Sequence, residues 1–454
     1  MHCAVDLARA TVAAVAAVAV GAAVLSGGSA ADPRTPPALP GLPPPFLGVA
    51  VVGSGGRAAA VDAYGDVVDL RVPGPAGRAL IYNPAKRQVA GTVPADTGIV
   101  ARMSVRGRSI PLWRADSVVQ RYVPGTNVLR TIARAGNTRA VIVRSIGGRG
   151  AVRADRRWVA RARPLGAGAP SWARRMYVRS LLVLRALTDR RTGAVAAGIR
   201  DSWAYVWPRD ASAVAIALAS AGYRTEGRRI ARFLVGLDLD AAARFHGDGS
   251  PVGGRGAQGD AAGWVAAAAR AAGLPVTRVR FGWRDRADYQ EKDPGEYLSN
   301  AVASGVDAGR IRSLFLDSQG LSRRAGGSGS GLDSAAAWAV RPFPHPALFP
   351  AARLSLHRLL EEREGRFGIV PSEDWPSGDP WTAPTAWTAW TLAALGDRRP
   401  ALRLMGDLRR AAMPTGLLPE RVDARTGIPT STTPLAWSHA FAILALRELW
   451  PSRG

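Results

Sequence analysis

The chain has 454 residues, which is enough for two or three domains of roughly 100–200 residues each. Its hydrophobic content of 47% excludes a disordered protein. The formal net charge is +25, but the basic residues are scattered and nearly all are arginine, with lysine only at Lys86 and Lys292. Because nucleic-acid binding depends on clustered cations, we expect no nucleic-acid partner, and at most an association with an anionic cell envelope or an acidic glycan.

Residues 1–30 have the pattern of an export segment. The run Ala10–Leu25 is almost wholly apolar, follows Arg9, and ends in the small residues Ser26–Ala30. Both a cleaved signal peptide and an uncleaved anchor remain possible, because the run is marginally long enough to span a bilayer. We therefore expect an exported protein, either secreted or anchored to the outer face of the cytoplasmic membrane. The single cysteine, Cys3, precedes this run, so the mature chain would contain no disulfide and no cysteine metal site.

The next three segments differ in composition. Residues 31–46 contain seven prolines and predict an extended linker. Residues 47–148 consist of short apolar runs, such as Val67–Val72 and Ala140–Val143, separated by Gly, Asp, Asn and Pro, which is typical of a small antiparallel β-sandwich domain. Residues 149–170 are polar and rich in arginine, and predict a connector.

From residue 171 to residue 454 the periodicity is helical, and we expect one mainly α catalytic domain. Helices without strands between them need a second layer of helices to cover their apolar faces. A repeat of fixed length is missing, which argues against a solenoid. The predicted helical segments are Met176–Leu187, Ala211–Ala221, Gly227–Val235, Ala261–Ala272, Tyr297–Val306, Ser334–Val340, Ala351–Arg363, Thr385–Leu395, Ala401–Ala411 and Leu435–Leu449.

Tryptophan is abundant, with 14 in the chain, and several lie in predicted loops beside acidic residues. Indole rings pack against the C–H faces of sugars, whose hydroxyl groups bind carboxylates and arginine. The alternative is that these large side chains fill the core of the helical domain. The tryptophans concerned are Trp203, Trp207, Trp264, Trp283, Trp375, Trp381 and Trp437.

The first chemical motif is Trp207-Pro208-Arg209-Asp210. From the residues alone, Asp210 could simply cap the helix that follows. The motif also resembles the Trp-Pro-Arg-Asp loop of glycoside hydrolase family 15, the glucoamylase and glucodextranase family. In that family the Arg-Asp pair binds hydroxyl groups of the non-reducing terminal sugar, and the resemblance implies this role for Arg209 and Asp210.

The second motif lies near the C-terminus. Leu418-Pro419-Glu420-Arg421-Val422-Asp423, followed by Thr426-Gly427 and Thr433-Pro434-Leu435-Ala436-Trp437-Ser438-His439-Ala440, resembles the bacterial "LPEQVD … TG … TPLAWSHA" element of the same family. The resemblance implies that Glu420 is the general base that activates water, and that Trp437 opens the last barrel helix. An exposed loop carboxylate is the alternative for Glu420.

Hydrolysis with inversion also needs a carboxylic acid on the opposite side of the scissile bond. Asp288-Tyr289-Gln290-Glu291 resembles the family's Asp-Tyr-Trp-Glu run, which implies that Glu291 is this acid. Glu296 is the competing candidate, and a solvated carboxylate without a catalytic role is also possible. We expect the carboxyl groups of Glu291 and Glu420 to lie roughly 6.5–9.5 Å apart across one cavity.

Two further stretches resemble family loops. Residues 256–264 imply substrate-binding roles for Asp260 and Trp264, and residues 371–381 imply such roles for Asp374 and Trp375. The chain departs from the family where Gln290 replaces a tryptophan and where Ile369-Val370 lacks an arginine that many members carry. These departures leave the sugar preference open.

The resemblance implies an (α/α)6 barrel preceded by the small β domain. Trp207, Arg209, Asp210 and Trp437 would close a pocket that admits only a chain terminus. The expected activity is exo-acting, inverting release of a terminal sugar, glucose, from α-linked gluco-oligosaccharides or an envelope glycan, by a monomer without metal or organic cofactor. A trehalose-cleaving member of the family and an inactive, glycan-binding barrel remain alternatives.

Overall fold

The computed structural model describes residues 50–72, 74–82, 99–199, 203–276, 282–291, 293–326 and 330–452. The expected export segment and the proline-rich linker lie outside these ranges. Within the described ranges, no helix has both the length and the apolar character that crossing a membrane requires.

The first part of the described chain forms three antiparallel sheets, in the orders β1-β2-β3-β4, β5-β6 and β7-β8-β9. In β8, buried residues alternate with more exposed ones, as expected for a sheet with one covered face. Both apolar runs named above are strands, β3 and β9. The strands are β1 (Ala50–Gly53), β2 (Ala58–Val61), β3 (Val67–Val72), β4 (Arg78–Tyr82), β5 (Arg102–Val105), β6 (Arg108–Pro111), β7 (Ser117–Tyr122), β8 (Leu129–Ala135) and β9 (Thr138–Arg144).

The rest of the chain is mainly helical, and each of the ten predicted helical segments contains a helix. Among the described α-helices, two were missed: α2, inside the expected connector, and α8. The α helices are α2 (Ala151–Ala160), α3 (Ser171–Leu187), α4 (Pro208–Ser220), α5 (Arg224–Val235), α6 (Ala261–Ala271), α7 (Leu298–Ala303), α8 (Ala308–Phe315), α9 (Phe349–Arg363), α10 (Thr382–Ala394), α11 (Arg398–Ala411) and α12 (Ala436–Leu449).

Short elements complete the fold. Two hairpins with strands of two residues each interrupt the helical part, where the sequence predicted no strands. The hairpins are β10 (Leu316–Asp317) with β11 (Gly320–Leu321), and β12 (Glu364–Gly365) with β13 (Gly368–Ile369). The 3-10 helices are η1 (Leu112–Arg114), η2 (Gly148–Gly150), η4 (Ser334–Ala339) and η5 (Pro346–Leu348).

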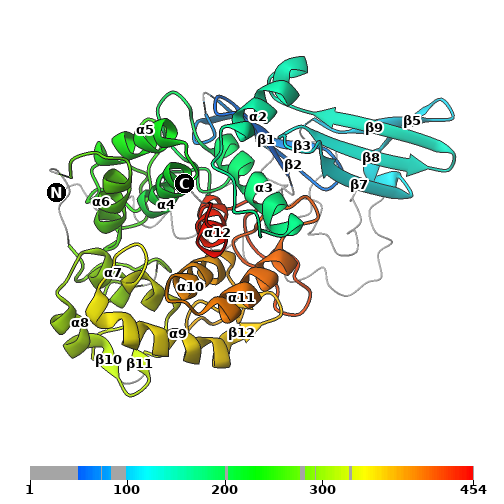
Figure 1. Cartoon of the computed structure of the whole chain (residues 1–454). Helices are drawn as coiled ribbons and strands as arrows, with labels where there is room; N and C mark the ends of the chain where they lie inside the picture. Colours follow the sequence, from blue (N-terminus) through cyan, green and yellow to red (C-terminus); the bar gives the residue numbers. More distant parts are fainter. Residues whose placement is uncertain are drawn as a thin grey trace, which may run out of the picture. The chain divides into compact units, whose positions relative to one another are not determined.

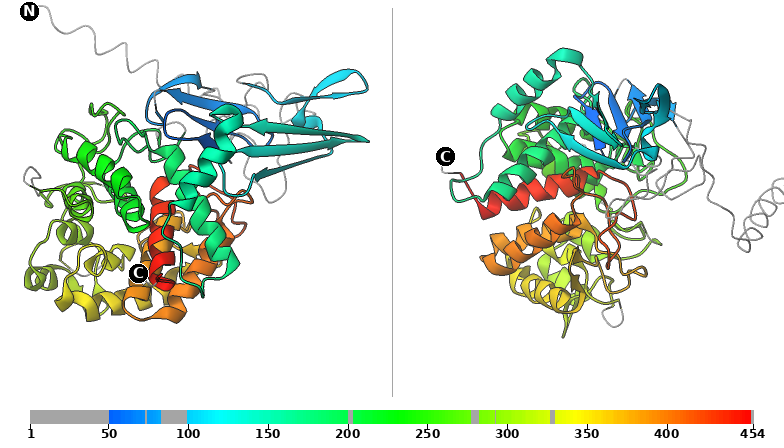
Figure 2. Two further views of the ribbon diagram at one scale, coloured as in Figure 1. Left: turned by 45° about the horizontal axis from the view of Figure 1, so that its top comes forward. Right: turned by 90° about the vertical axis from the view of Figure 1, so that its right-hand side faces the viewer.

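Six of these elements pack against one another in a closed sequence. α4 contacts α6, which contacts α7, and the chain of contacts continues through η4, α10 and α12 back to α4 (Figure 1). The inner helices α4, α6, α10 and α12 are buried on almost every side, because their sequences are mainly apolar and small residues rather than one apolar stripe. The views in Figure 2 also show α12, in red, beside α3 and α10.

The remaining long helices cover this inner layer. α3 packs on α12, α5 on α4 and α6, α9 on η4, and α11 on α10. Their sequences are amphipathic: in α5, for example, the buried residues are Gly227, Ile230, Ala231 and Leu234, at the spacing of one helical face. In α5 and α11 the binary pattern therefore matches a place in the outer layer.

The β region shares its core with the helices. Val51 and Val68 belong to the same buried cluster as the apolar face of α3. Asn127 donates hydrogen bonds to the carbonyl oxygens of Leu182 in α3 (2.8 Å) and Gly53 in β1 (3.1 Å). These buried polar contacts attach the sheets to α3.

Candidate active site

A cavity of about 310 Å³ lies at the N-terminal ends of three inner helices. Trp207 immediately precedes α4, Trp381 precedes α10 and Leu435 precedes α12, and all three line the cavity. The loops before these helices therefore bring residues from distant parts of the chain together. At its N-terminal end, each helix has backbone N–H groups without a partner inside the helix, and the helix dipole is positive there. Both features favour anionic and polar groups at this place.

Seven of the ten predicted site residues line this cavity, and three do not. Those that line it are Trp207, Arg209, Asp210, Glu291, Trp375, Glu420 and Trp437. Asp260, Trp264 and Asp374 lie elsewhere, in the contacts described below. The competing acid, Glu296, is not among the lining residues, and it pairs with Arg284 (3.0 Å) instead.

Glu291 reaches the cavity from the loop between α6 and α7. Its carboxylate accepts hydrogen bonds from Trp207 Nε1 (2.6 Å) and Gln258 Nε2 (3.3 Å), and it forms an ion pair with Arg255. Its backbone has a φ of 57°, which is uncommon for a residue other than glycine, and its N–H donates to the carbonyl of Asp288 (3.0 Å). A tight turn and three donors together orient this carboxylate.

Glu420 lies in the loop between α11 and α12 and is held mainly by its backbone. Its N–H donates to the carbonyl of Thr432 (2.9 Å), and its carbonyl accepts from the N–H of Thr382 (2.9 Å) at the start of α10. Ser431 Oγ donates to Glu420 Oε2. The backbone of Glu420 is thus fixed between the first turn of α10 and the loop before α12, and Ser431 contacts its carboxylate.

Arg209 and Asp210 occupy the first turn of α4 and are both buried. Arg209 Nη1 binds Asp260 Oδ2 (3.1 Å), Nη2 lies 3.4 Å from Asp210 Oδ2, and the guanidinium stacks 4.7 Å above the Trp437 ring. Burial raises the pKa of Asp210 to about 7; the charge of Arg209 opposes this rise, and that of Glu420 adds to it. Asp260 binds the guanidinium of Arg209 and is not among the residues that line the cavity.

Several polar atoms of the lining have no hydrogen-bond partner among the described residues, although they are buried. They are Arg209 Nε, Asp210 Oδ2, Gln290 Oε1, Trp381 Nε1 and Trp437 Nε1. Buried polar groups normally find partners, because leaving them unpaired costs free energy. Donors and acceptors of this kind around one cavity suit a ligand that carries many hydroxyl groups.

Trp264 and Asp374 serve other contacts. Trp264 is fully buried and packs edge-on against Trp338 (5.1 Å between ring centroids) and Phe343 (5.0 Å), so it belongs to the core of the inner layer. Asp374 binds the guanidinium of Arg323.

Sequence reasoning missed three residues that contact the candidate carboxylates or the turn before Glu291, namely Arg255, Arg323 and Ser431. Arginine is so frequent in this chain that no single one stands out, and Ser431 lies within a motif that was interpreted only through Glu420.

Among the described residues, no group of three or more His, Cys, Asp or Glu side chains is placed to hold a metal ion.

Comparison with known sequences gives a family match for one part of the chain. Residues 171–238, which include Arg209 and Asp210, match the family model described as glycosyl hydrolases family 15. No curated protein sequence matches the chain.

Solved structures share the fold. A bacterial glucoamylase complexed with acarbose is 10% identical with a TM-score of 0.65, over 91% of this chain and 95% of that chain. A wild-type glycosidase is 22% identical with a TM-score of 0.54, over 62% of this chain and 99% of that chain. The glucoamylase of Hormoconis resinae is 13% identical with a TM-score of 0.50, over 62% of this chain and 74% of that chain. Residues 171–238 of the chain thus resemble glycosyl hydrolase family 15, and the chain shares the mainly helical fold with small antiparallel sheets of the bacterial glucoamylase.

Proposed function

We propose that the protein is an exo-acting, inverting glycoside hydrolase that releases glucose from the non-reducing end of α-linked gluco-oligosaccharides. The observation that carries this proposal is that Glu291 and Glu420, from loops far apart in the sequence, line one cavity together with Arg209 and Asp210. Most glycoside hydrolases use two carboxyl groups, one on either side of the scissile glycosidic bond.

In the proposed reaction, Glu291 donates a proton to the glycosidic oxygen, while Glu420 takes a proton from the attacking water. The water attacks the face opposite the leaving group, so the anomeric configuration inverts. Glu420, oriented by Ser431, serves as the base. Glu291 must carry a proton to act, and its ion pair with Arg255 favours the charged form, so this ion pair has to open when substrate enters.

The proposed exo mode rests on the small volume of the cavity and on the buried residues at the start of α4. Its volume of about 310 Å³ is at the lower end of the range for small-molecule sites. In the proposal, buried Arg209 and Asp210, with the ring of Trp437 beside them, close one end of this cavity. Arg209 Nε and Asp210 Oδ2, which have no hydrogen-bond partner among the described residues, would bind hydroxyl groups of a terminal sugar there. As part of the proposal, the closed sequence of six inner elements is the inner layer of an (α/α)6 barrel.

A single assay tests the proposal. The protein is incubated with maltose, maltotriose, isomaltose, trehalose and cell-envelope glycans, and the products are followed by chromatography and by proton NMR of the anomeric centre. We expect monosaccharide from the start of the reaction, with β-glucose appearing first from an α-linked substrate. Early release of mixed oligosaccharides, or of α-glucose, would contradict it. Cleavage of trehalose alone would indicate the trehalose-cleaving alternative, and binding without release would indicate a glycan-binding protein.

A further inference from the structure

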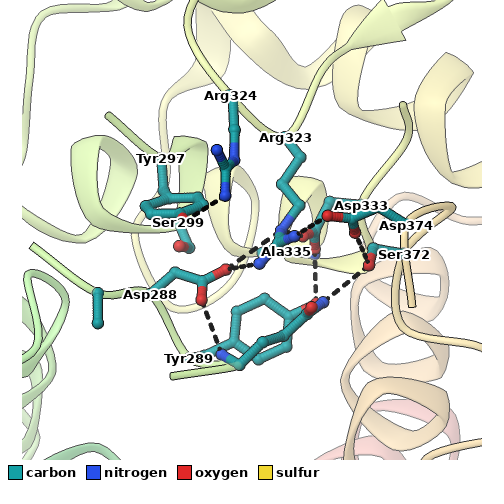
Figure 3. Close-up of polar contacts among 12 residues, drawn as sticks. Asp288, Tyr289, Tyr297, Ser299, Arg323, Arg324, Asp333, Ala335, Ser372 and Asp374 are labelled. Atoms are coloured by element: carbon teal, nitrogen blue, oxygen red, sulfur yellow. Dashed lines mark hydrogen bonds and ion pairs between the residues drawn. The ribbon is translucent and has the colours of Figure 1, made fainter. Parts of the chain in front are cut away.

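One buried arginine connects three loops around the candidate site. Arg323 follows β11 and is only 1% exposed. Its guanidinium contacts the carboxylates of Asp288 (Nε to Oδ2, 3.2 Å), Asp333 (Nε to Oδ2, 3.2 Å) and Asp374. Figure 3 shows the Arg323 side chain directed between the carboxylates of Asp288 and Asp333. The three acids come from three separate loops.

The first of these acids shapes the turn that carries Glu291. Asp288 Oδ1 accepts from the N–H of Gln290 (3.0 Å), and its carbonyl accepts from the N–H of Glu291 (3.0 Å). The side chain of Gln290 then donates to Tyr289 Oη (3.0 Å) and Ser372 Oγ (2.9 Å). The turn is therefore attached at one end to Arg323 and at the other to the loop that contains Ser372.

The other two acids belong to the loops that lead to η4 and to Trp375. Asp333 caps η4 by accepting from the N–H of Ala335 (2.6 Å), and it also accepts from Tyr289 Oη (2.8 Å). Asp374 accepts from Ser372 Oγ (2.6 Å) and immediately precedes Trp375, which lines the cavity. Arg323 thus links the Glu291 turn to the Trp375 wall.

The charges make this arrangement specific for arginine. Three carboxylates face one guanidinium, and burial raises the pKa of Asp333 to about 7, although Arg323 opposes the rise. Arginine presents donors in a planar fork, whereas lysine offers one compact ammonium group. A lysine would keep the positive charge but could not keep all three contacts.

We propose that Arg323 is a positioning residue that fixes Glu291 relative to the bound sugar. Glu291 has a positive φ, and such a conformation persists only when the surrounding contacts hold it. Arg323 acts through Asp288 and does not line the cavity itself. The inference rests on the proposed function, because it assigns Arg323 to the placement of the proton donor.

The test compares Arg323→Lys with Arg324→Met. Arg324 is the neighbouring residue, is exposed, and donates to Tyr297 Oη (2.8 Å) rather than to the Glu291 turn, so it is a matched control. Each variant is assayed on maltose, whose leaving group needs a proton, and on α-glucosyl fluoride, whose fluoride leaves with little protonation. We expect Arg323→Lys to lower kcat on maltose roughly 10- to 100-fold and on the fluoride less than about 3-fold. We expect Arg324→Met to resemble the wild type on both substrates.

Equal losses on the two substrates would overturn the inference, because a merely structural role would affect both alike. Hydrogen exchange of the unliganded protein gives a readout that does not depend on activity. The amides of Gln290 and Glu291 should exchange at least about 10-fold faster in Arg323→Lys, with global stability measured alongside, and an unchanged rate would also overturn the inference. A wild type without hydrolase activity would refute the proposed function, and the exchange result would still decide whether Arg323 holds the turn.

If Arg323→Lys does not fold, Asp374→Asn takes its place. Asp374 has a partly exposed side chain, at 37%, so its replacement removes one contact of Arg323 at lower cost to folding. Because Asp374 immediately precedes Trp375, which lines the cavity, this variant should raise KM more than it lowers kcat. An unchanged KM and kcat would overturn the link between Arg323 and the Trp375 wall.

Discussion

Trp207 donates its indole N–H to Glu291 Oε1 over 2.6 Å, which joins the residue before α4 to the loop before α7. We expect Trp207→Phe to keep the fold, since a ring still fills the site, and to lower kcat roughly 10-fold or more, because the carboxylate loses an orienting donor. Steady-state kinetics on maltose, with circular dichroism as the control for folding, measure this. An unchanged kcat would show that the hydrogen bond does not orient the acid.

The two carboxylates should each be indispensable for turnover. Glu291→Gln and Glu420→Gln are each expected to reduce kcat about 100-fold or more, since general acid–base groups typically contribute 10²–10⁴. Glu296→Gln is the matched control, because Glu296 pairs with Arg284 outside the cavity lining, and it should stay close to the wild type. Full activity in either of the first two variants would remove that residue from the mechanism.

Arg255 should limit the pH range of activity. Its side chain is 44% exposed and pairs with Glu291, which favours the charged carboxylate over the protonated form that the reaction needs. We expect Arg255→Gln to extend kcat/KM to higher pH, with the alkaline limb of the profile shifted upwards. Rate profiles from pH 4 to 9 measure this shift. A profile shifted to lower pH would mean that Arg255 does not act on Glu291 in this way.

A buried carboxylate far from the cavity should make stability depend on pH. Burial, together with Glu364, raises the pKa of Asp407 in α11 from 3.8 to about 7. The folded protein therefore holds this proton more tightly than the unfolded chain, and the free energy of unfolding falls as pH rises from about 4 to about 7.

Asp407→Asn isolates this contribution, because Asp210 and Asp333, whose pKa values are also raised to about 7, are present in both proteins. The free energy of unfolding of the variant minus that of the wild type should be about 1–2 kcal/mol larger at pH 8 than at pH 4. Urea unfolding at both values measures it. A difference that is constant with pH would contradict the raised pKa.

Trp264 should matter for stability and not for substrate affinity. It is buried among Trp338, Phe343 and Phe441 and does not line the cavity. Trp264→Phe should lower the free energy of unfolding by about 1–3 kcal/mol and leave KM within about 2-fold of the wild type. A large rise in KM with little loss of stability would return Trp264 to the substrate site.

Much of the local structure follows from the sequence. All ten predicted helical segments contain helices, because their apolar residues recur at helical spacing. The helix α2 was missed, since a polar, arginine-rich segment with few apolar residues gives a weak periodic signal, yet Ala151, Asp155 and Trp158 still bury one face of it. The hairpin strands of two residues are too short to show any alternation.

By itself, the sequence determined the helical class of the second region, because local spacing is a property of the chain. Its motifs carry the family resemblance that makes Glu291 and Glu420 candidates. Only the tertiary structure decided which candidates share a cavity. It placed Trp264 in the core, turned Asp260 toward Arg209, and brought Arg323 to three carboxylates from separate loops. The physical reason is that burial and ion pairing depend on the directions of side chains at the ends of helices. These helices come from distant parts of the chain, and local periodicity does not specify those directions.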